Sequence, residues 1–283
     1  MAINNILRKE LNKYPQIKRL LVPVWMNLCN IHWRVFKSLG LPVKYPVGDR
    51  IAMLHPEGQI PEVLWKHNFE ENERNFLSTY LKTGMQVANI GANVGLYSVL
   101  ASIIVGSNGR IHAFEPSTVS YSRLKKNLIL NGCENVITNQ IALSNAKGQL
   151  VLRVDPLNPT YDGHNFVEMV KPGDLLQSDE TVEATTLDAY MAAQANRTLD
   201  LIIMDVEGAE LSVLEGGAEA ISQPNLTLLM ECSKHHDAVK KLLEKDGYSF
   251  WVWNANERGL VPADFMEVTR RGDVIARRSG WRA

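Results

Sequence analysis

The 283-residue sequence predicts an α/β fold with a doubly wound, mostly parallel sheet. Three observations lead to this prediction. From residue 60 onward, short apolar runs of strand length alternate with amphipathic runs of helix length. A glycine-containing turn, NIGANVGLYS at 89–98, joins the first of these strands to its helix. Acidic residues follow several apolar runs, at the carboxyl ends of strands where such sheets bind ligands.

The predicted elements follow one another in strand–helix order. An amphipathic helix begins near Glu70 and stops before Gly84. Strands are expected at 87–90, 110–114, 136–141, 199–206, 226–231, 250–253 and 274–277. Helices are expected at 95–105, 118–130, 210–221 and 235–246. Because the helices act as crossovers, most of the strands should be parallel.

The first 59 residues differ from the rest in charge and pattern, so we expect an extension (1–59) before a main domain (60–283). Residues 1–50 contain nine Lys or Arg and two acids, a net charge of +7, which leaves −8 for the remaining chain. Pro15 and Pro23 predict a division into short helices with partly apolar faces. Such a segment either packs on the main domain or contacts an anionic membrane surface or a partner protein.

Composition excludes several classes of protein. A net charge of −1 creates no overall field for nucleic acid, so no nucleic-acid partner is expected. The three cysteines are widely separated, which argues for a reducing compartment and against a disulfide or zinc framework. No apolar run suits a membrane span, and no cleavable signal peptide is recognised. We therefore expect a cytoplasmic protein, and membrane association through residues 1–50 is the alternative.

The turn at 89–98 narrows the choice of ligand. A P-loop requires Gly-Lys-Ser/Thr, but Gly95 is followed by Leu-Tyr, which rejects a triphosphate site. A dinucleotide fingerprint requires glycine where Asn93 stands, because a side chain there obstructs the pyrophosphate. Glu115 nevertheless ends the next strand, where an acid accepts hydrogen bonds from ribose hydroxyls. The pattern favours S-adenosylmethionine, whose carboxylate would take amides of the turn and the helix N-terminus.

Six segments between residues 60 and 253 resemble the FkbM family of S-adenosylmethionine-dependent methyltransferases: NIGANVGLYS, AFEPS, NLILNG, IALSN, TLDAY and LDLIIMDVEGAELSVLEGG. MDVEGAE is the most specific of them. The resemblance implies a class I methyltransferase (Rossmann-like) domain of seven strands, the last antiparallel. It also implies O-methylation, often of sugar or polyketide hydroxyls. The cofactor-binding residues expected from these segments are Asn89, Gly91, Ala92, Asn93, Gly95, Tyr97, Glu115, Pro116, Ser117, Ala142 and Asp205.

One residue departs from the family pattern. The family usually has aspartate where this chain has Asn89. An aspartate would engage the cofactor's ammonium, whereas asparagine offers only a neutral carbonyl, so we expect weakened but retained binding. The substitution also raises the alternative of a non-catalytic, cofactor-binding homologue. Tyr97 and Glu70, which belong to the family pattern near this turn, are expected to close over the cofactor.

Acids and histidines at later strand ends are the candidates for catalysis. Methyl transfer to a hydroxyl requires in-line approach and benefits from a base that removes the proton. Asp205 and Glu207 follow one strand two residues apart, so they share a direction, while Glu231 and His235 follow the next strand. Helix capping and salt bridging are the structural alternatives. Three acids also suit Mg²⁺, but no compact ligand motif is present, so a metal is not favoured.

The interval 145–197 is longer than a simple crossover and predicts a cover over the substrate. GQLVLRV alternates like a strand within it. Tyr161, Asp162, His164 and Asn165 suit a polyhydroxylated acceptor, and His164 is a rival base. A surface loop without contacts is the alternative. The expected acceptor is a hydroxyl of a sugar, glycoconjugate or related natural product, and methylation of an amine or carboxylate is the runner-up.

Overall fold

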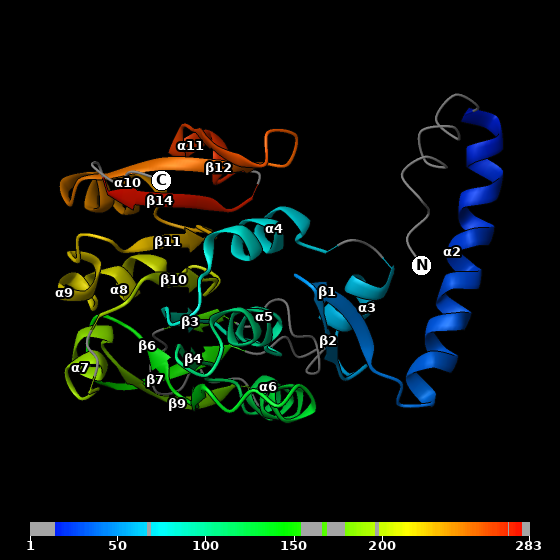
Figure 1. Ribbon diagram of the computed structural model, residues 1–283, viewed down its shortest axis with the longest axis horizontal. Helices are drawn as coiled ribbons and strands as arrows, with labels where there is room; N and C mark the ends of the chain where they lie inside the picture. Colours follow the sequence, from blue (N-terminus) through cyan, green and yellow to red (C-terminus); the bar gives the residue numbers. More distant parts are fainter. Residues whose placement is uncertain are drawn as a thin grey trace.

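The computed structural model describes residues 15–66, 69–153, 166–168, 179–195, 198–270 and 272–278. Figure 1 shows a central sheet between layers of helices. The sheet contains β3 (Gln86–Ile90), β4 (Arg110–Phe114), β5 (Val136–Asn139), β10 (Leu201–Met204), β11 (Thr227–Met230), β12 (Tyr248–Asn254), β13 (Gly259–Pro262) and β14 (Val274–Arg278). Its order is β13-β12-β14-β11-β10-β3-β4-β5.

The strand directions confirm the predicted fold class. β5, β4, β3, β10 and β11 are parallel neighbours. β14, the last strand in the described part of the chain, runs antiparallel between β11 and β12. All seven predicted strands form, with ends that differ by up to two residues. The eighth strand, β13, is a hairpin partner of β12 that the sequence did not predict, because GLVP is too short to show an alternation.

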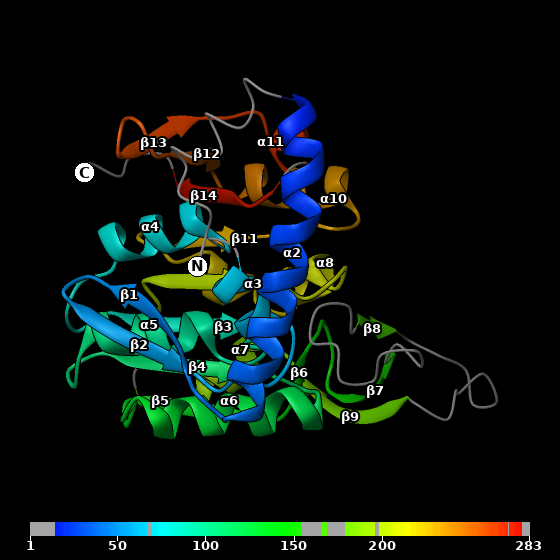
Figure 2. The ribbon, with the colours of Figure 1, turned by 90° about the vertical axis from the view of Figure 1, so that its right-hand side faces the viewer.

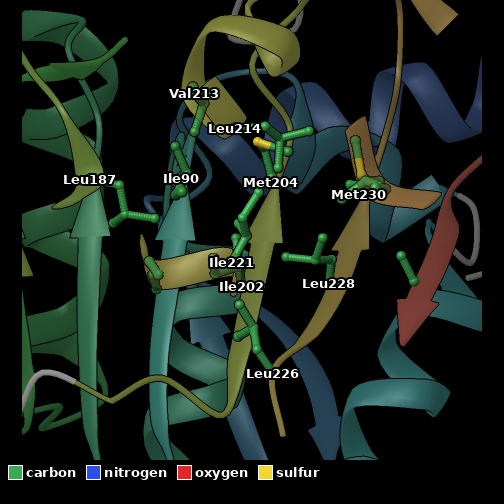
Figure 3. Packing of buried hydrophobic residues seen from close by; sticks show 14 of the residues in the cluster. Ile90, Leu187, Ile202, Met204, Val213, Leu214, Ile221, Leu226, Leu228 and Met230 are labelled. Carbon is green, nitrogen blue, oxygen red and sulfur yellow. The ribbon is translucent and has the colours of Figure 1, made fainter. Parts of the chain in front are cut away.

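Helices cover both faces of the sheet and bury alternate strand residues. One face carries α4 (Glu71–Tyr80), α5 (Leu96–Val105) and α6 (Thr118–Leu130), and the other carries α7 (Leu187–Ala192), α8 (Glu210–Glu215), α9 (Ala218–Ile221), α10 (His236–Lys245) and α11 (Phe265–Val268). Along β10, Leu201 and Ile203 face the first group, whereas Ile202 and Met204 face the second (Figure 3). The helix expected at 210–221 is divided in two, because glycines at 216–217 disfavour the helical conformation.

The N-terminal region differs from the expected set of short helices. α2 (Pro15–Ser38) is continuous through Pro23, since an internal proline removes one hydrogen bond without necessarily ending a helix. Residues 43–54 form a hairpin of β1 (Val43–Val47) and β2 (Arg50–Leu54) instead of helix. Its inward residues belong to the core beneath α5 and α6: Tyr45, Val47, Ala52 and Leu54. Packing on the main domain thus begins ahead of the expected boundary at residue 59.

A second, smaller sheet occupies part of the long interval after β5. It has the order β6-β9-β7-β8 and consists of β6 (Ala142–Leu143), β7 (Gly148–Arg153), β8 (Phe166–Glu168) and β9 (Glu180–Thr185). β7 is the strand expected in GQLVLRV. Tyr161, Asp162, His164 and Asn165 lie outside the described residues, so their roles stay predictions.

Helix α2 lies along one side of the molecule, outside the layers (Figures 1 and 2). α3 (Ile60–Lys66) connects it to the domain: the ring of Trp65 lies 5.6 Å from that of Trp33 and 5.9 Å from that of Phe36, centroid to centroid. Within the described residues, no helix combines the length and apolar character needed to cross a membrane.

Candidate functional site

A pocket of about 340 Å³ lies at the carboxyl ends of the parallel strands. Loops after β3, β4, β5, β10 and β11 supply most of its wall, and α3 supplies part of the rim. The acidic end, beside β10 and β11, is formed by Glu70, Asp205, Glu207 and Glu231. The apolar end, beside β4 and β5, is formed by Phe114, Pro116, Ile141, Ala142, Leu143 and Leu152. The pocket thus changes from acidic to apolar across neighbouring strand ends.

The turn after β3 brings two strand ends into contact. Gly91 has φ of +80° and its N–H donates to the carbonyl of Phe114 at 3.0 Å. A Cβ on Gly91 would lie 1.8 Å from the carbonyl oxygen of Asp205, so only glycine allows the loops after β3 and β10 to approach. Gly91 and Asn93 both line the pocket, and their predicted contacts with the cofactor stay predictions.

Gly95 and Ala92 lie beneath the turn instead of in the pocket wall. A Cβ on Gly95 would lie 2.7 Å from Cδ1 of Leu124, so the close packing of α5 and α6 explains this glycine. Ala92 is buried in the same core. Cofactor contacts at these two residues stay predictions.

Glu115 is buried in the pocket wall with its carboxylate held by backbone amides. The N–H of Asn93 donates to Oε2 at 2.7 Å, and the N–H of Ser117 donates to Oε1 at 2.9 Å. Ser117 is also the N-cap of α6, and Pro116 lines the pocket between them. These two hydrogen bonds fix the orientation of the Glu115 carboxylate in the pocket wall.

Asn89 is turned away from the pocket, contrary to the expected contact with the cofactor's ammonium. Its side chain is 2% exposed, and Nδ2 donates to Oγ of Ser98 on α5 at 2.8 Å. Alternation along β3 accounts for this, because Asn89 shares the face of Val87, beneath α5, whereas Ile90 faces the other side.

Glu70 lines the acidic end of the pocket, whereas Asn89 does not. The hydroxyl of Tyr97 donates to its carboxylate, and Glu70 precedes α4 with φ of +49°. Burial raises the pKa of Glu70 to about 7, although the Tyr97 hydrogen bond opposes that change. Tyr97 does not itself line the pocket, so it acts on the site by orienting Glu70.

Asp205, Glu207 and Glu231 come together at the acidic end, as the sequence predicted. Burial, followed by the neighbouring charges of Glu231, Glu207 and Glu70, holds the pKa of Asp205 well above its usual range. Its Oδ1 is buried and has no hydrogen-bond partner among the described residues. Asp205 thus presents a buried carboxyl oxygen without a hydrogen bond at the acidic end of the pocket.

Strained backbone gathers at the same place. Of the five non-glycine residues with positive φ in the described chain, three line the pocket: Glu70, Asn93 and Glu207. Such conformations cost about 1–3 kcal/mol each and are typical of functional sites.

Two acids near the site, Asp273 and Glu210, were not predicted as site residues from the sequence. Asp273 precedes β14, and burial together with nearby Glu73, Glu70 and Asp205 raises its pKa well above normal. Because β14 is antiparallel, its beginning lies at the same sheet edge as the ends of its neighbours. The sequence did contain a signal for Asp273, because this acid directly precedes the strand predicted at 274–277. Glu210, in MDVEGAE, is fully buried and accepts the N–H of Gly208 at 2.8 Å.

Two candidate bases are not brought into the pocket. His235 is exposed at the N-cap of α10 and does not line the pocket, which contradicts the expected catalytic position. His164 lies outside the described residues. In the part of the chain that the structure describes, no three His, Cys, Asp or Glu side chains are arranged to hold a metal ion.

Residues 89–250, more than half of the chain, match the family described as the Methyltransferase FkbM domain. The chain belongs to this family. It is 28% identical over 212 residues to Methyltransferase sdnD of Sordaria araneosa, covering 65% of this chain and 80% of that protein. The solved FkbM methyltransferase of Methylobacillus flagellatus KT shares 15% identity (TM-score 0.45; 70% of this chain and 45% of that one). A solved SAM-dependent O-methyltransferase of Thermotoga maritima shares 14% sequence identity, with a TM-score of 0.43. The match covers 86% of this chain and 79% of that one.

The pocket of this FkbM-type, S-adenosylmethionine-dependent methyltransferase suits its cofactor. Glu115 has a fixed orientation in the pocket wall, and its contact with the ribose hydroxyls stays a prediction. One end of the pocket wall is apolar and the other acidic, as a ligand with an aromatic ring and positive charges requires.

Proposed function

We propose that this methyltransferase transfers the methyl group to a hydroxyl oxygen of a sugar, glycoconjugate or related natural product. The observation that supports the proposal is the position of Asp205, whose buried Oδ1 has no hydrogen-bond partner among the described residues and which lines the pocket beside Glu207 and Glu231. A hydroxyl nucleophile benefits from a base, and the ionised carboxylate of Asp205 has an oxygen that can take its proton.

Bound S-adenosylmethionine supplies a methyl group activated by its sulfonium. In the proposed step, Asp205 accepts the proton of the acceptor's hydroxyl while that oxygen bonds to the methyl carbon. The carbon–sulfur bond breaks, and S-adenosylhomocysteine is released. Glu207 and Glu231 accept hydrogen bonds from further hydroxyls and hold the acceptor in line, which favours a polyhydroxylated molecule over a simple alcohol.

Product analysis tests the proposal directly. The protein is incubated with S-adenosylmethionine and a panel of sugar nucleotides and lipid-linked glycans, and release of S-adenosylhomocysteine identifies the acceptor. The expected product carries one methyl ether, which resists mild base. A base-labile methyl ester or an N-methylated product would contradict hydroxyl methylation. Asp237 is an exposed acid on α10, and Asp237→Asn is the matched control for Asp205→Asn. The control variant should retain full activity.

A further inference from the structure

Helix α2 carries an apolar face that the domain does not cover. Val24, Leu28, Ile31 and Val35 are 57%, 57%, 59% and 51% exposed. Their spacing of four, three and four residues places them on one side of the helix, and we call this set the outer stripe. Leu39, 65% exposed, follows just beyond the last turn. Exposed aliphatic residues in one continuous line indicate a docking surface.

The outer stripe faces away from the domain. Trp33, 4% exposed, and Phe36 pack against Trp65 of α3 and hold the helix on its opposite side. At 100° per residue, Trp33 points about 170° away from the mean direction of the stripe. Truncating the stripe therefore leaves the contacts between α2 and the domain in place.

The helix that carries the stripe is positively charged. Pro15–Ser38 contains no Asp or Glu, whereas Arg19, Arg34 and Lys37 are exposed along it. Lys44 and Arg50 of the following hairpin are exposed as well. Residues 1–50 together carry +7, opposite in sign to the −8 of the remaining chain.

We propose that the outer stripe docks on an anionic membrane surface. A second copy would bring two basic helices together without an acid on either, which like-charge repulsion opposes. Protein interfaces are enriched in aromatic and methionine side chains at their centre, whereas the stripe is wholly aliphatic. An apolar stripe on a basic, acid-free helix is the pattern of helices that lie in the lipid interface.

Docking would also hold the pocket close to the surface. Ile60 and Val63 of α3 line the pocket, and Trp65 of the same helix holds α2. One short helix therefore connects the docking surface to the rim of the site. Acceptors presented at a lipid surface would meet the pocket directly, although docking itself does not depend on the acceptor.

Vesicle sedimentation of the full chain tests this proposal. The protein should bind vesicles of phosphatidylcholine mixed with phosphatidylglycerol, and should bind phosphatidylcholine alone far more weakly. High salt should weaken the binding by screening the basic residues. Equal binding to both kinds of vesicle, or no binding to the anionic kind, would overturn the proposal.

Substitutions separate the apolar from the electrostatic contribution. Leu28→Gln, Ile31→Gln and Val35→Gln combined should lower vesicle affinity on the order of 100-fold, because three partly inserted side chains are lost. Arg34→Gln with Lys37→Gln should lower it roughly 10- to 30-fold and reduce the salt dependence. The controls are Ile129→Gln, an 80% exposed residue of α6, and Lys241→Gln with Lys245→Gln on α10.

Two further measurements keep the interpretation unambiguous. Each variant should retain wild-type affinity for S-adenosylhomocysteine and the wild-type thermal midpoint, since the stripe is not part of the core. Light scattering should show the same mass for wild type and the triple variant. A wild-type dimer that the triple variant abolishes, without anionic vesicle binding, would assign the stripe to a second copy and overturn the membrane proposal.

Discussion

Two carboxylates on opposite sides of β3 show how differently one functional group can be used. Glu115, after β4, has each of its oxygens engaged by a backbone N–H. Asp205, after β10, has a buried Oδ1 without a hydrogen-bond partner in the described chain, and other acids lie around it. Backbone amides thereby fix the orientation of Glu115, whereas no hydrogen bond in the described chain holds Oδ1 of Asp205.

The difference comes from the surroundings of each carboxyl group. Backbone amides stabilise an ionised carboxylate, and neighbouring acids destabilise it. We therefore expect substitutions near β4 to change cofactor affinity, and substitutions near β10 to change turnover. Four predictions test this division, from the largest expected effect to the smallest.

Removal of the proposed base should have the largest effect. Asp205→Asn should lower kcat by roughly 10²–10⁴ with little change in S-adenosylhomocysteine affinity, because the amide cannot take a proton. Glu207→Gln should mainly raise KM for the acceptor. Chelation by EDTA should leave the wild type active. Loss of activity that Mg²⁺ restores would instead indicate that these acids hold a metal.

Removal of the ribose acceptor should affect binding. Glu115→Ala should weaken S-adenosylhomocysteine at least about tenfold in calorimetry, since hydrogen bonds to a charged acceptor contribute about 1.5–3 kcal/mol each. Glu134→Ala, an exposed residue before β5, is the control. Unchanged affinity in Glu115→Ala would refute the ribose contact.

Glu70 should contribute to cofactor affinity only when ionised. Glu70→Gln should weaken S-adenosylhomocysteine about tenfold, but not 5′-methylthioadenosine, which lacks the ammonium. The pKa of Glu70 is raised to about 7, so the wild-type advantage should grow from about pH 6 to about pH 8. Glu71→Gln, exposed in the first turn of α4, is the control.

The same raised pKa has a consequence for folding. The folded state binds this proton more tightly than the unfolded chain, so the Glu70 contribution to stability is lost as pH rises from 4.5 towards 7. Glu70→Gln should therefore raise the thermal midpoint more at high pH than at low pH. A pH-independent difference between the two proteins would show that Glu70 does not titrate in this range.

Asn89→Asp should have the smallest effect on the cofactor. Its side chain is engaged with Ser98 beneath α5, so affinity should change less than about threefold. A tenfold gain would show that residue 89 reaches the ammonium after all. Calorimetry with S-adenosylhomocysteine measures this outcome, and Ser98→Ala tests whether the hydrogen bond restrains the side chain.

The sequence by itself determined the fold class, the pocket's location and most of its acids. Strand and helix periodicities are local properties, so β3, β4 and α6 could be read from short windows. Parallel strands end at one edge of the sheet, so the sequence alone predicted that Glu115, Asp205 and Glu231 lie together, and all three line the pocket. The segments MDVEGAE and FEP resemble the family to which the chain belongs, and residues of both segments line the pocket.

Only the tertiary structure decided which of these residues face the pocket. A side chain at the end of a strand has two faces available, and packing against α5 took Asn89 out of the site. Asp273 lies near the acidic end, without lining the pocket, because its antiparallel strand begins where its neighbours end. Glu70 depends on a hydrogen bond to Tyr97, 27 residues away. These contacts join segments distant in the chain, and local periodicity carries no information about such pairings.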